Sequence, residues 1–590
     1  MCGIIGYAGE NNAADVVYKG LKRLEYRGYD SAGAAFMLGG KITVIKKEGK
    51  VETLAQYLNN VSADIGIGHT RWATHGKPSD INAHPHSAGA ITVVHNGIIE
   101  NYSELKERLI SDGADFLSDT DSEVAAHLIN EFYKGDLTAA VAQAVKMLKG
   151  SYALMAIRAG ESKIVAARYK SPLIVGYGNG ENFCASDEPA LAGICEKVCV
   201  LEDGDIAEIT ADGVNIYNGN LQLVIRSVLP NLAVSESLGL GDCPHYMLKE
   251  LREVPQSVQF THKAFYGVEE KLKSALSGVN RVIFTGCGTA YHAALIGKRY
   301  VESFARIPAE VETAGEFRYK NPVFGAGAAV FAISQSGETA DTVEAARLAK
   351  AGGAKVVAVT NCLRSELTRI ADVVVPVAAG VEICVAATKS YTGQVAALYL
   401  CALTLAGEDI GGGRGKLLLK MPELCKKAVE SIDAGALAQL CASARGVYFL
   451  GRDIDYAVAV EGSLKLKEVS YIAGEGYPAG ELKHGTLALI DGKTVSIFII
   501  TDGGLAGKTE NAVEQVVSRG GKAAVITNVD GVEERLKDKA DYFIKLPECD
   551  KYLSPLVSAV AVQLIAYRTA VMLGRDPDKP RNLAKSVTVE

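Results

Sequence analysis

Two patterns of hydrophobic and polar positions divide the chain near residue 220. Beyond that point, short β-branched runs alternate with longer helical patterns, as in 330–334, 338–352 and 355–360. This alternation is typical of a parallel sheet, because successive parallel strands are joined by a helix that covers the sheet. The second half is therefore predicted to form α/β doubly wound sheets.

The first 220 residues show a different pattern, with more frequent short strands. The predicted strands are 2–9, 32–38, 41–47, 90–97, 151–157 and 163–169. Helical periodicity covers 13–26, 101–113 and 122–133. These elements predict a layered α+β domain.

The second half also repeats itself at an offset of about 165 residues. The matching pairs are 282–288 with 447–453, 314–317 with 479–482, 352–361 with 520–528, and 371–377 with 540–546. A period of this length indicates a duplicated domain. We expect domains at 2–217, 246–415 and 416–575, a linker rich in Ser, Gly and Pro at 218–245, and a C-terminal tail at 576–590.

Composition narrows the classes of partner. The chain has 62 Lys and Arg against 69 Asp and Glu, a net charge of −7, without long basic blocks, so no nucleic-acid partner is expected. Its 12 cysteines form no CxxC pair and follow no secretory leader, which predicts a reducing cytoplasm. The apolar stretches 393–407 and 556–574 are expected to be buried helices and not membrane spans.

Candidate chemistry begins at Cys2. Removal of Met1 would leave one residue with both a thiol and a free α-amino group, which is a nucleophile beside a general base. On its own, a cysteine at this position is more typical of an ordinary buried thiol.

Further along, the stretch 69–76 contains Arg71, Trp72, Thr74 and His75, and Trp72 is the only tryptophan. Arg71 suits an α-carboxylate, and Asp121 suits an α-ammonium. The side chain of Asn96 with the N–H of Gly97 could form an oxyanion hole. Together these groups would hold glutamine against a nucleophile, although each alone could be a capping or turn residue.

In the second half, Ser334, Gln335, Ser336 and Thr339 lie between a predicted strand and a helix start. Hydroxyls and backbone N–H groups at such a turn form an anion cradle, with ordinary N-capping as the alternative. A second turn brings Gly286, Gly288 and Thr289 to the same edge. The duplicate lacks the serines and has Asp502, so we expect one phosphate site, in the first copy.

The second copy contributes acidic and basic residues on a helix and the loop after it, namely Glu461, Lys465, Lys467, Glu468, Glu481, Lys483 and His484. Lys465 and Glu468 are three residues apart and project from one helix face, which a solvated ion pair would also explain. Lys585 lies in a polar tail that could fold into a site or fray.

Taken in order, these motifs resemble the glutamine:fructose-6-phosphate amidotransferase (isomerizing) family over nearly the whole chain. The matching segments are MCGIIGY, LEYRGYDSAG, HTRWATHG, NAHPH, HNGIIENY, SDTDSE, SQSGETADT, ELKHG and PRNLAKSVTVE. The resemblance implies an N-terminal-nucleophile (αββα) glutaminase domain followed by two sugar isomerase domains. It also implies a homodimer, and glutamine and fructose 6-phosphate as substrates, without a cofactor or metal.

The resemblance further implies a role for each matching residue. Cys2 is the nucleophile, with Asn96 and Gly97 at the oxyanion; Arg71, Thr74, His75 and Asp121 match glutamine-recognition positions, and Trp72 an ammonia-channel gate. Thr289, Ser334, Gln335, Ser336 and Thr339 match sugar-phosphate positions. Lys585 matches the Schiff-base lysine, His484 the ring-opening histidine from the neighbouring subunit, Glu468 the base between C1 and C2, and Lys465 a further active-site lysine.

This chain departs from the family pattern at Ala290 and Ala387, where a serine is usual, and at Thr486, where a proline is usual. These differences affect hydrogen bonds to the sugar. The implied activity is the first step of amino-sugar biosynthesis, giving glucosamine 6-phosphate and glutamate.

The alternatives are an isomerase or deglycase of aminated sugars and a non-enzymatic sugar-phosphate sensor. Among other amidotransferases, a phosphoribosyltransferase would need an acidic pyrophosphate-binding strand, and an asparagine synthetase an SGGxDS-like loop. The sequence shows neither.

Overall fold

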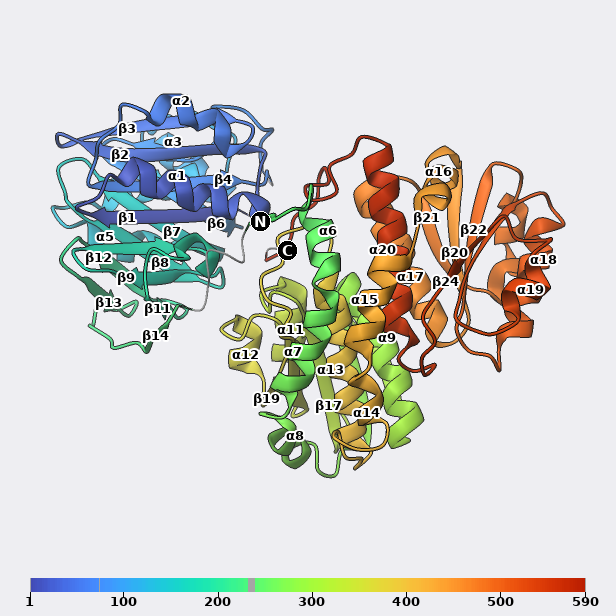
Figure 1. Ribbon diagram of the computed structural model, residues 1–590. Helices are drawn as coiled ribbons and strands as arrows, with labels where there is room; N and C mark the ends of the chain where they lie inside the picture. Colours follow the sequence, from blue (N-terminus) through green and yellow to red (C-terminus); the bar gives the residue numbers. More distant parts are fainter. Residues whose placement is uncertain (1, 74, 232–238, 589–590) are drawn as a thin grey trace. The chain divides into compact units, whose positions relative to one another are not determined.

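The computed structural model describes residues 2–73, 75–231 and 239–588. The chain divides into two compact units, one of Met1–Gly239 with Ala584–Glu590 and the other of Leu240–Leu583. Figure 1 labels the elements of both. Each unit is described by itself below.

Two antiparallel sheets form the centre of the first unit, counted within the described residues. The eight-stranded sheet has the order β14 (Val228–Pro230), β11 (Lys197–Val200), β9 (Ile174–Tyr177), β10 (Glu181–Ala185), β1 (Gly3–Gly9), β4 (Ile65–Arg71), β2 (Ser31–Leu38) and β3 (Lys41–Glu48). The six-stranded sheet has the order β13 (Val214–Tyr217), β12 (Ile206–Ile209), β8 (Ile164–Tyr169), β7 (Gly150–Arg158), β6 (Ile91–Ile99) and β5 (His86–Ala88).

Helices cover the outer faces of these sheets. Their bounds are α1 (Ala13–Leu24), α3 (Tyr102–Ser111), α4 (Glu123–Phe132) and α5 (Leu137–Val145), with short turns at η1 (Glu25–Arg27), η2 (Val51–Leu54), α2 (Ala55–Leu58) and η3 (Glu188–Leu191). The sequence predicted three of the four longer helices, and α5 was missed.

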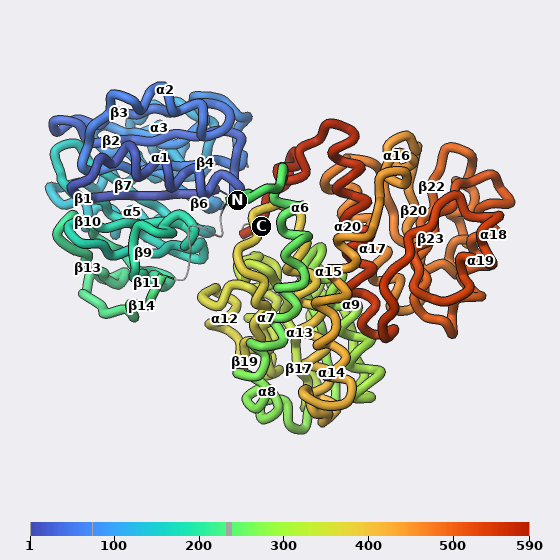
Figure 2. The backbone as a smooth tube through the Cα atoms, in the orientation of Figure 1, coloured from blue at the N-terminus to red at the C-terminus, as the bar shows by residue number. Residues whose placement is uncertain are grey.

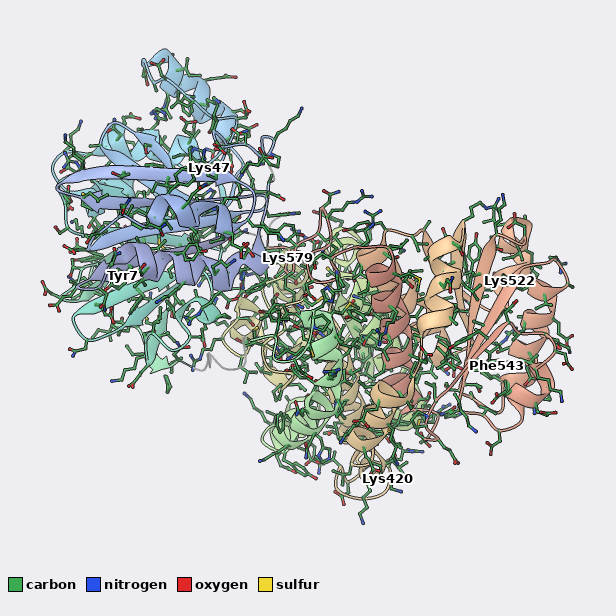
Figure 3. The ribbon with its side chains drawn as sticks, turned by 45° about the horizontal axis from the view of Figure 1, so that its top comes forward. Tyr7, Lys47, Lys420, Lys522, Phe543 and Lys579 are labelled. Carbon is green, nitrogen blue, oxygen red and sulfur yellow. The ribbon has the colours of Figure 1, made fainter. Side chains whose placement is uncertain are left out.

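Alternation along β1 explains the layering. Ile4 and Ala8 join the apolar cluster between the two sheets, whereas Ile5 and Tyr7 face the cluster that contains α1. Successive side chains of a strand point to opposite faces, so one strand serves both layers. Figure 3 labels Tyr7 on this strand. A third cluster packs α3, α4 and α5 against the six-stranded sheet, which completes the predicted αββα arrangement.

Two parallel five-stranded sheets form the second unit, within the part of the chain that the structure describes. The first has the order β16 (Ala309–Thr313), β15 (Arg281–Gly286), β17 (Ala328–Ser334), β18 (Lys355–Thr360) and β19 (Val373–Pro376). The second has the order β21 (Gly474–Pro478), β20 (Gly446–Gly451), β22 (Thr494–Ile500), β23 (Lys522–Thr527) and β24 (Tyr542–Lys545). The two orders are identical, which confirms the predicted duplication of a doubly wound sheet.

The duplication extends to local backbone conformation. Gly288 precedes α9 with a φ of 53°, and Asp453 precedes α17 with a φ of 55° at the equivalent position. A positive φ at an aspartate is uncommon, so this shared turn is a specific trace of the common ancestor of the two copies.

Helices of the second unit are α6 (Tyr246–Arg252), α7 (Val254–Phe265), α8 (Glu269–Ala275), α9 (Thr289–Tyr300), α10 (Ala314–Tyr319), α11 (Ala340–Ala351), α12 (Glu366–Ile370), α13 (Lys389–Leu405), α14 (Gly415–Leu418), α15 (Met421–Ser431), α16 (Gly435–Ser443), α17 (Ile454–Ser470), α18 (Ala506–Val517), α19 (Val532–Leu536) and α20 (Ser554–Met572). The short turns are η5 (Val301–Ala305), η6 (Glu481–His484) and η7 (Thr486–Leu489).

One apolar cluster takes residues from both copies, including α9, α13, α17 and α20. Figure 2 shows α17 and α20 side by side. Among the described residues, one helix, α20, is long and apolar enough to cross a membrane, and 83% of its most apolar window is buried inside the protein. It therefore has the burial of a core helix, as the sequence predicted.

The predicted linker and the start of the predicted C-terminal tail both make hydrogen bonds to neighbouring elements. Within 218–245, β14 pairs with β11, while 232–238 lie outside the described residues. The start of the tail is held by Asp578, whose carboxylate accepts hydrogen bonds from the N–H groups of Tyr246 and Met247, each at 2.7 Å. These bonds cap the N-terminus of α6.

Candidate functional site

The thiol of Cys2 lies against the backbone of Trp72, at the end of β4. Trp72 N–H donates to Cys2 Sγ at 3.3 Å, and Sγ lies 3.5 Å from Trp72 O. Burial raises the pKa of Cys2, while the charge of the amino terminus, the bond from Trp72 and the charge of Arg71 lower it. A thiol with a raised pKa needs a base in order to attack, so the site requires a proton acceptor near Cys2.

Asn96 and Gly97 lie on β6 of the six-stranded sheet, and the Asn96 side chain contacts Cys2. Asn96 Nδ2 donates to Cys2 O at 3.0 Å, and Asn96 Oδ1 is buried without a partner among the described residues. Gly97 has a φ of 137°, and a Cβ there would lie 2.0 Å from Ser151 O. Because of this positive φ and this close contact, only glycine fits at this position of β6.

Arg71 is buried at the end of β4. One guanidinium nitrogen, Nη2, donates to the carbonyls of His75 and Gly76, whereas Nη1 is buried with no partner in the described part of the chain. Burial lowers the pKa of Arg71 from its ordinary value, and the guanidinium still remains charged. A buried guanidinium N–H without an acceptor suits an incoming carboxylate.

Asp121 is also buried, and it accepts from Ile99 N–H at 2.8 Å and from the Ser122 hydroxyl at 3.3 Å. Its charge and that of Arg71 both act on the Cys2 thiol, in opposite directions. The structure therefore brings Cys2, Arg71, Asn96 and Asp121 to one place. His75 is half-buried, with its ring edge-on to Tyr102 at 5.4 Å, and Thr74 lies outside the described residues.

Two residues that support this site were not singled out as site residues. Asp30 Oδ2 accepts the N–H of Ala73 at 2.8 Å, and a Cβ on Gly28 would lie 2.7 Å from Trp72 N. Both lie in the LEYRGYDSAG segment, so the signal was present in the sequence as a motif, without an indication of what it touches. They hold the backbone that contacts Cys2.

Four buried histidines, His69, His84, His86 and His95, lie on or next to strands β4, β5 and β6. His69 stacks on His84 at 4.0 Å and contacts His95 O at 3.1 Å, and His84 meets His86 at 4.5 Å. Burial lowers the pKa of all four, so they are neutral packing and hydrogen-bonding groups. They join β4 of one sheet to β6 of the other.

In the second unit, β15 and β17 are adjacent, with Gly286 opposite Ile333. Their carboxyl ends therefore bring the turn at Gly288 and the loop 335–339 to one edge. The hydroxyls of Ser334 and Thr339 are 3.0 Å apart, and Ser334 and Ser336 accept from the N–H groups of Gly337 and Glu338. Gln335 is half-buried at the start of this loop.

The equivalent edge of the second copy is filled by its own carboxylate. Asp455, at the position of Ala290, accepts the Thr501 N–H at 2.9 Å and the Thr501 hydroxyl. Burial raises its pKa to about 7, against the bonds from Thr501, which lower it. The donors that would face an anion in this copy are already occupied.

A buried ionic network joins the two copies. Lys465 and Glu461 are fully buried on α17, and Lys465 Nζ lies 2.5 Å from Glu468 Oε2 and 3.6 Å from Glu461 Oε1. Burial alone would lower the pKa of Lys465, but the two carboxylates outweigh it and raise the pKa. Thr289 of the first copy donates to Glu461 Oε1 at 3.3 Å.

Two further predicted residues are described by their own surroundings. His484 is exposed at the end of η6, and its ring makes none of the contacts of the network in the described residues. Lys585 is half-buried in Ala584–Glu590, which groups with the first unit. Of the departures, Ala290 is buried, Ala387 is half-buried and Thr486 is buried at the start of η7.

Comparison with known proteins gives matches along the whole chain. Residues 69–193 match a glutamine amidotransferase domain, and residues 275–404 and 440–573 match the SIS domain. The glutamine–fructose-6-phosphate aminotransferase (isomerizing) of Clostridium tetani is 44% identical over 611 residues, covering 100% of both chains. A protein of the same name from Thermus thermophilus is 46% identical, again over 100% of both.

Among solved structures, the C-terminal domain of glucosamine-fructose-6-phosphate aminotransferase from Francisella tularensis is 33% identical, with a TM-score of 0.54. It covers 58% of this chain and 99% of its own. The full-length identity to named relatives and the two kinds of matched domain lead to one conclusion. The chain belongs to the family of glutamine–fructose-6-phosphate aminotransferases (isomerizing).

Proposed function

We propose that this protein transfers the amide nitrogen of glutamine to fructose 6-phosphate and isomerises the ketose, giving glucosamine 6-phosphate and glutamate. The observation that carries the proposal is the combination, in one chain, of two features. Cys2 is held against the backbone of Trp72, the residue after Arg71, whose buried Nη1 has no partner among the described residues, and the second unit has a duplicated fold that matches the SIS domain. The relatives' names supply the substrates.

At the glutamine site, Met1 is removed and the α-amine of Cys2 takes the thiol proton. Sγ then attacks the carboxamide carbon, the oxyanion is stabilised by Asn96 and the Gly97 N–H, and ammonia leaves with the proton. Water hydrolyses the thioester to glutamate. Arg71 binds the α-carboxylate and Asp121 the α-ammonium, with Thr74 and His75 completing recognition and Trp72 gating the release of ammonia.

At the sugar site, the loop containing Ser334, Gln335, Ser336 and Thr339, with Thr289 beside it, holds the phosphate. Donors at the carboxyl edge of a parallel sheet support this assignment, and the filled second copy supports a single site per chain. His484 opens the sugar ring, and Lys585 forms a Schiff base at C2 of the open-chain ketose with release of water. Ammonia then displaces the Lys585 amine from C2, which leaves the imine of the sugar. Glu468 moves the proton between C1 and C2, with Lys465 as its ion-pair partner.

The division of labour follows the predicted domains, 2–217 for glutamine, 246–415 and 416–575 for the sugar, with 218–245 as linker and 576–590 as a tail that supplies Lys585. The exposure of His484 supports its use by a partner subunit in a homodimer. All 12 cysteines lie within the described residues and none forms a disulfide there, which supports a cytoplasmic location.

The test is a Cys2→Ala variant assayed with two nitrogen sources. It should lose glutamine-dependent synthesis of glucosamine 6-phosphate, because the nucleophile is gone. It should retain synthesis from a high concentration of ammonium salt, because the sugar site is intact. Glutamine-dependent synthesis at the wild-type rate in this variant would show that Cys2 is not the nucleophile.

A further inference from the structure

His292, on the first turn of α9, contacts the buried ionic network from the first copy. Its Nδ1 lies 2.8 Å from Glu461 Oε2, and its side chain is 13% exposed. Glu461 and His292 are 169 residues apart in sequence. His292 has no role in the reaction proposed above, yet its ring contacts Glu461, one of the two carboxylates near Lys465.

The network holds two carboxylates and one ammonium. Lys465 is much closer to Glu468, at 2.5 Å, than to Glu461, at 3.6 Å, although both are within reach of the same nitrogen. Charges removed from water interact strongly, so the fully buried Glu461 and Glu468, whose side chain is 22% exposed, compete for a single ammonium. A hydrogen-bond donor that binds Glu461 would satisfy this carboxylate and leave the Lys465 ammonium to Glu468.

We propose that His292 is a positioning residue that donates from Nδ1 to Glu461 and so leaves Lys465 paired with Glu468. The inference rests on the proposed function, because it matters only if Glu468 is the base that moves the proton. A base that keeps its ammonium partner stays ionised to lower pH. By binding Glu461, His292 thereby keeps the ammonium of Lys465 on Glu468.

Other groups that face the network come from α9 itself, from α13 and from the loop before α13. The Thr289 hydroxyl on α9 also donates to Glu461 Oε1, at 3.3 Å. Tyr391 on α13 interacts with the charge of Glu461, Cys384 interacts with that of Lys465, and Tyr291 packs against the His292 ring at 5.9 Å. Since Thr289 serves the other oxygen of Glu461, it does not replace His292 on Oε2.

The experiment measures how fast solvent deuterium enters C1 of fructose 6-phosphate in the absence of glutamine. This rate reports abstraction of the C1 proton alone. His292→Leu and His292→Phe remove the donor, whereas His292→Asn keeps an N–H close to the position of Nδ1. In the donor-free variants the acid limb of the pH–rate profile should move up by about one unit, a rate about tenfold lower on that limb. His292→Asn should follow the wild type, and the KM for the sugar should not change.

A Glu461→Gln background provides the matched control, because it removes the competing carboxylate. There, His292→Leu should cause no further shift of the acid limb. An unchanged limb in a folded His292→Leu or His292→Phe variant would overturn the inference, and so would an equal loss in all three variants at every pH. Absence of exchange in the wild type would instead overturn the proposed function on which it rests.

Discussion

At the scale of single residues, the glutamine site depends on positions that tolerate little change. Gly97 has a backbone that a side chain would force into Ser151 O, and Gly28 lies under the Arg71–Trp72 peptide. The Asn96 side chain donates a hydrogen bond from Nδ2 to Cys2 O, and its buried Oδ1 has no partner in the described residues. These are the constraints of a site shaped around a ligand.

Asn96→Ala should lower kcat of glutamine hydrolysis by about 10² to 10³, because one oxyanion donor is lost. Ammonium-dependent synthesis should keep its rate, since Asn96 is not among the residues proposed to bind or convert the sugar. Glutamate release at saturating glutamine measures the effect. A kcat within about twofold of the wild type would remove Asn96 from the oxyanion hole.

At the scale of elements, the two copies share strand order and a left-handed turn, and they differ in what fills the carboxyl edge. In the first copy, Ser334, Ser336 and Thr339 line the loop after β17. In the second, the Asp455 carboxylate takes the N–H and hydroxyl of Thr501 after β22. The two copies thus share the fold and differ in the hydrogen bonds at this edge.

Ser336→Ala should raise the KM for fructose 6-phosphate by about 5- to 150-fold, corresponding to about 1 to 3 kcal/mol for a hydrogen bond to a charged group. The matched control is Asp502→Ala at the corresponding position of the second copy, which should leave that KM unchanged. Steady-state kinetics with ammonium as nitrogen donor compares them. The reverse order of effects would place the phosphate in the second copy.

Asp455 should make stability depend on pH. Its folded pKa of about 7 lies above the ordinary 3.8, so folding favours the protonated form. The stabilisation is complete below about pH 4 and is lost as pH rises to about 7. Asp455→Asn, which cannot ionise, should therefore gain about 2 kcal/mol over the wild type between about pH 5 and pH 8.

Urea unfolding of both proteins at the two pH values measures that difference. If the difference in the free energy of unfolding between wild type and variant is the same at both pH values, Asp455 ionises normally in the folded protein.

Local patterns predicted the alternating elements of the second unit and six of the fourteen strands described in the first, but not the contacts between elements. The strand–turn–helix signals at 282–289 and 330–340 are local, and the spacing of Lys465 and Glu468 already places both on one helix face. The partners of Glu461 were not accessible in this way, because His292 lies on another helix of another copy. Likewise, no local signal tells that Asp30 holds Ala73.

At the scale of the whole molecule, the glutamine amidotransferase match lies in the first unit and both SIS matches lie in the second, and His484 is exposed in the single chain. An exposed residue with a catalytic assignment needs either a movement or a second chain. The proposed homodimer supplies the second chain, with His484 of one subunit serving the Glu468 of the other.

Subunit complementation tests this arrangement. His484→Ala and Glu468→Gln should each abolish sugar turnover, and dimers mixed from the two should regain it, because one site of each mixed dimer combines an intact Glu468 with an intact His484. Random pairing should restore about one quarter of wild-type activity, since half of the dimers are mixed and each has one good site of two. No recovery in verified mixed dimers would place His484 within its own subunit's site.

The central claim is direct transfer of nitrogen from glutamine to the sugar within one protein. The most direct measurement supplies glutamine labelled with ¹⁵N in its amide, together with unlabelled ammonium and fructose 6-phosphate, and determines the label in glucosamine 6-phosphate against glutamate formed. The account predicts one labelled amino sugar per glutamate, because the amide nitrogen does not mix with the ammonium pool. Product labelled only to the extent of that pool, or glutamate formed without amino sugar, would contradict it.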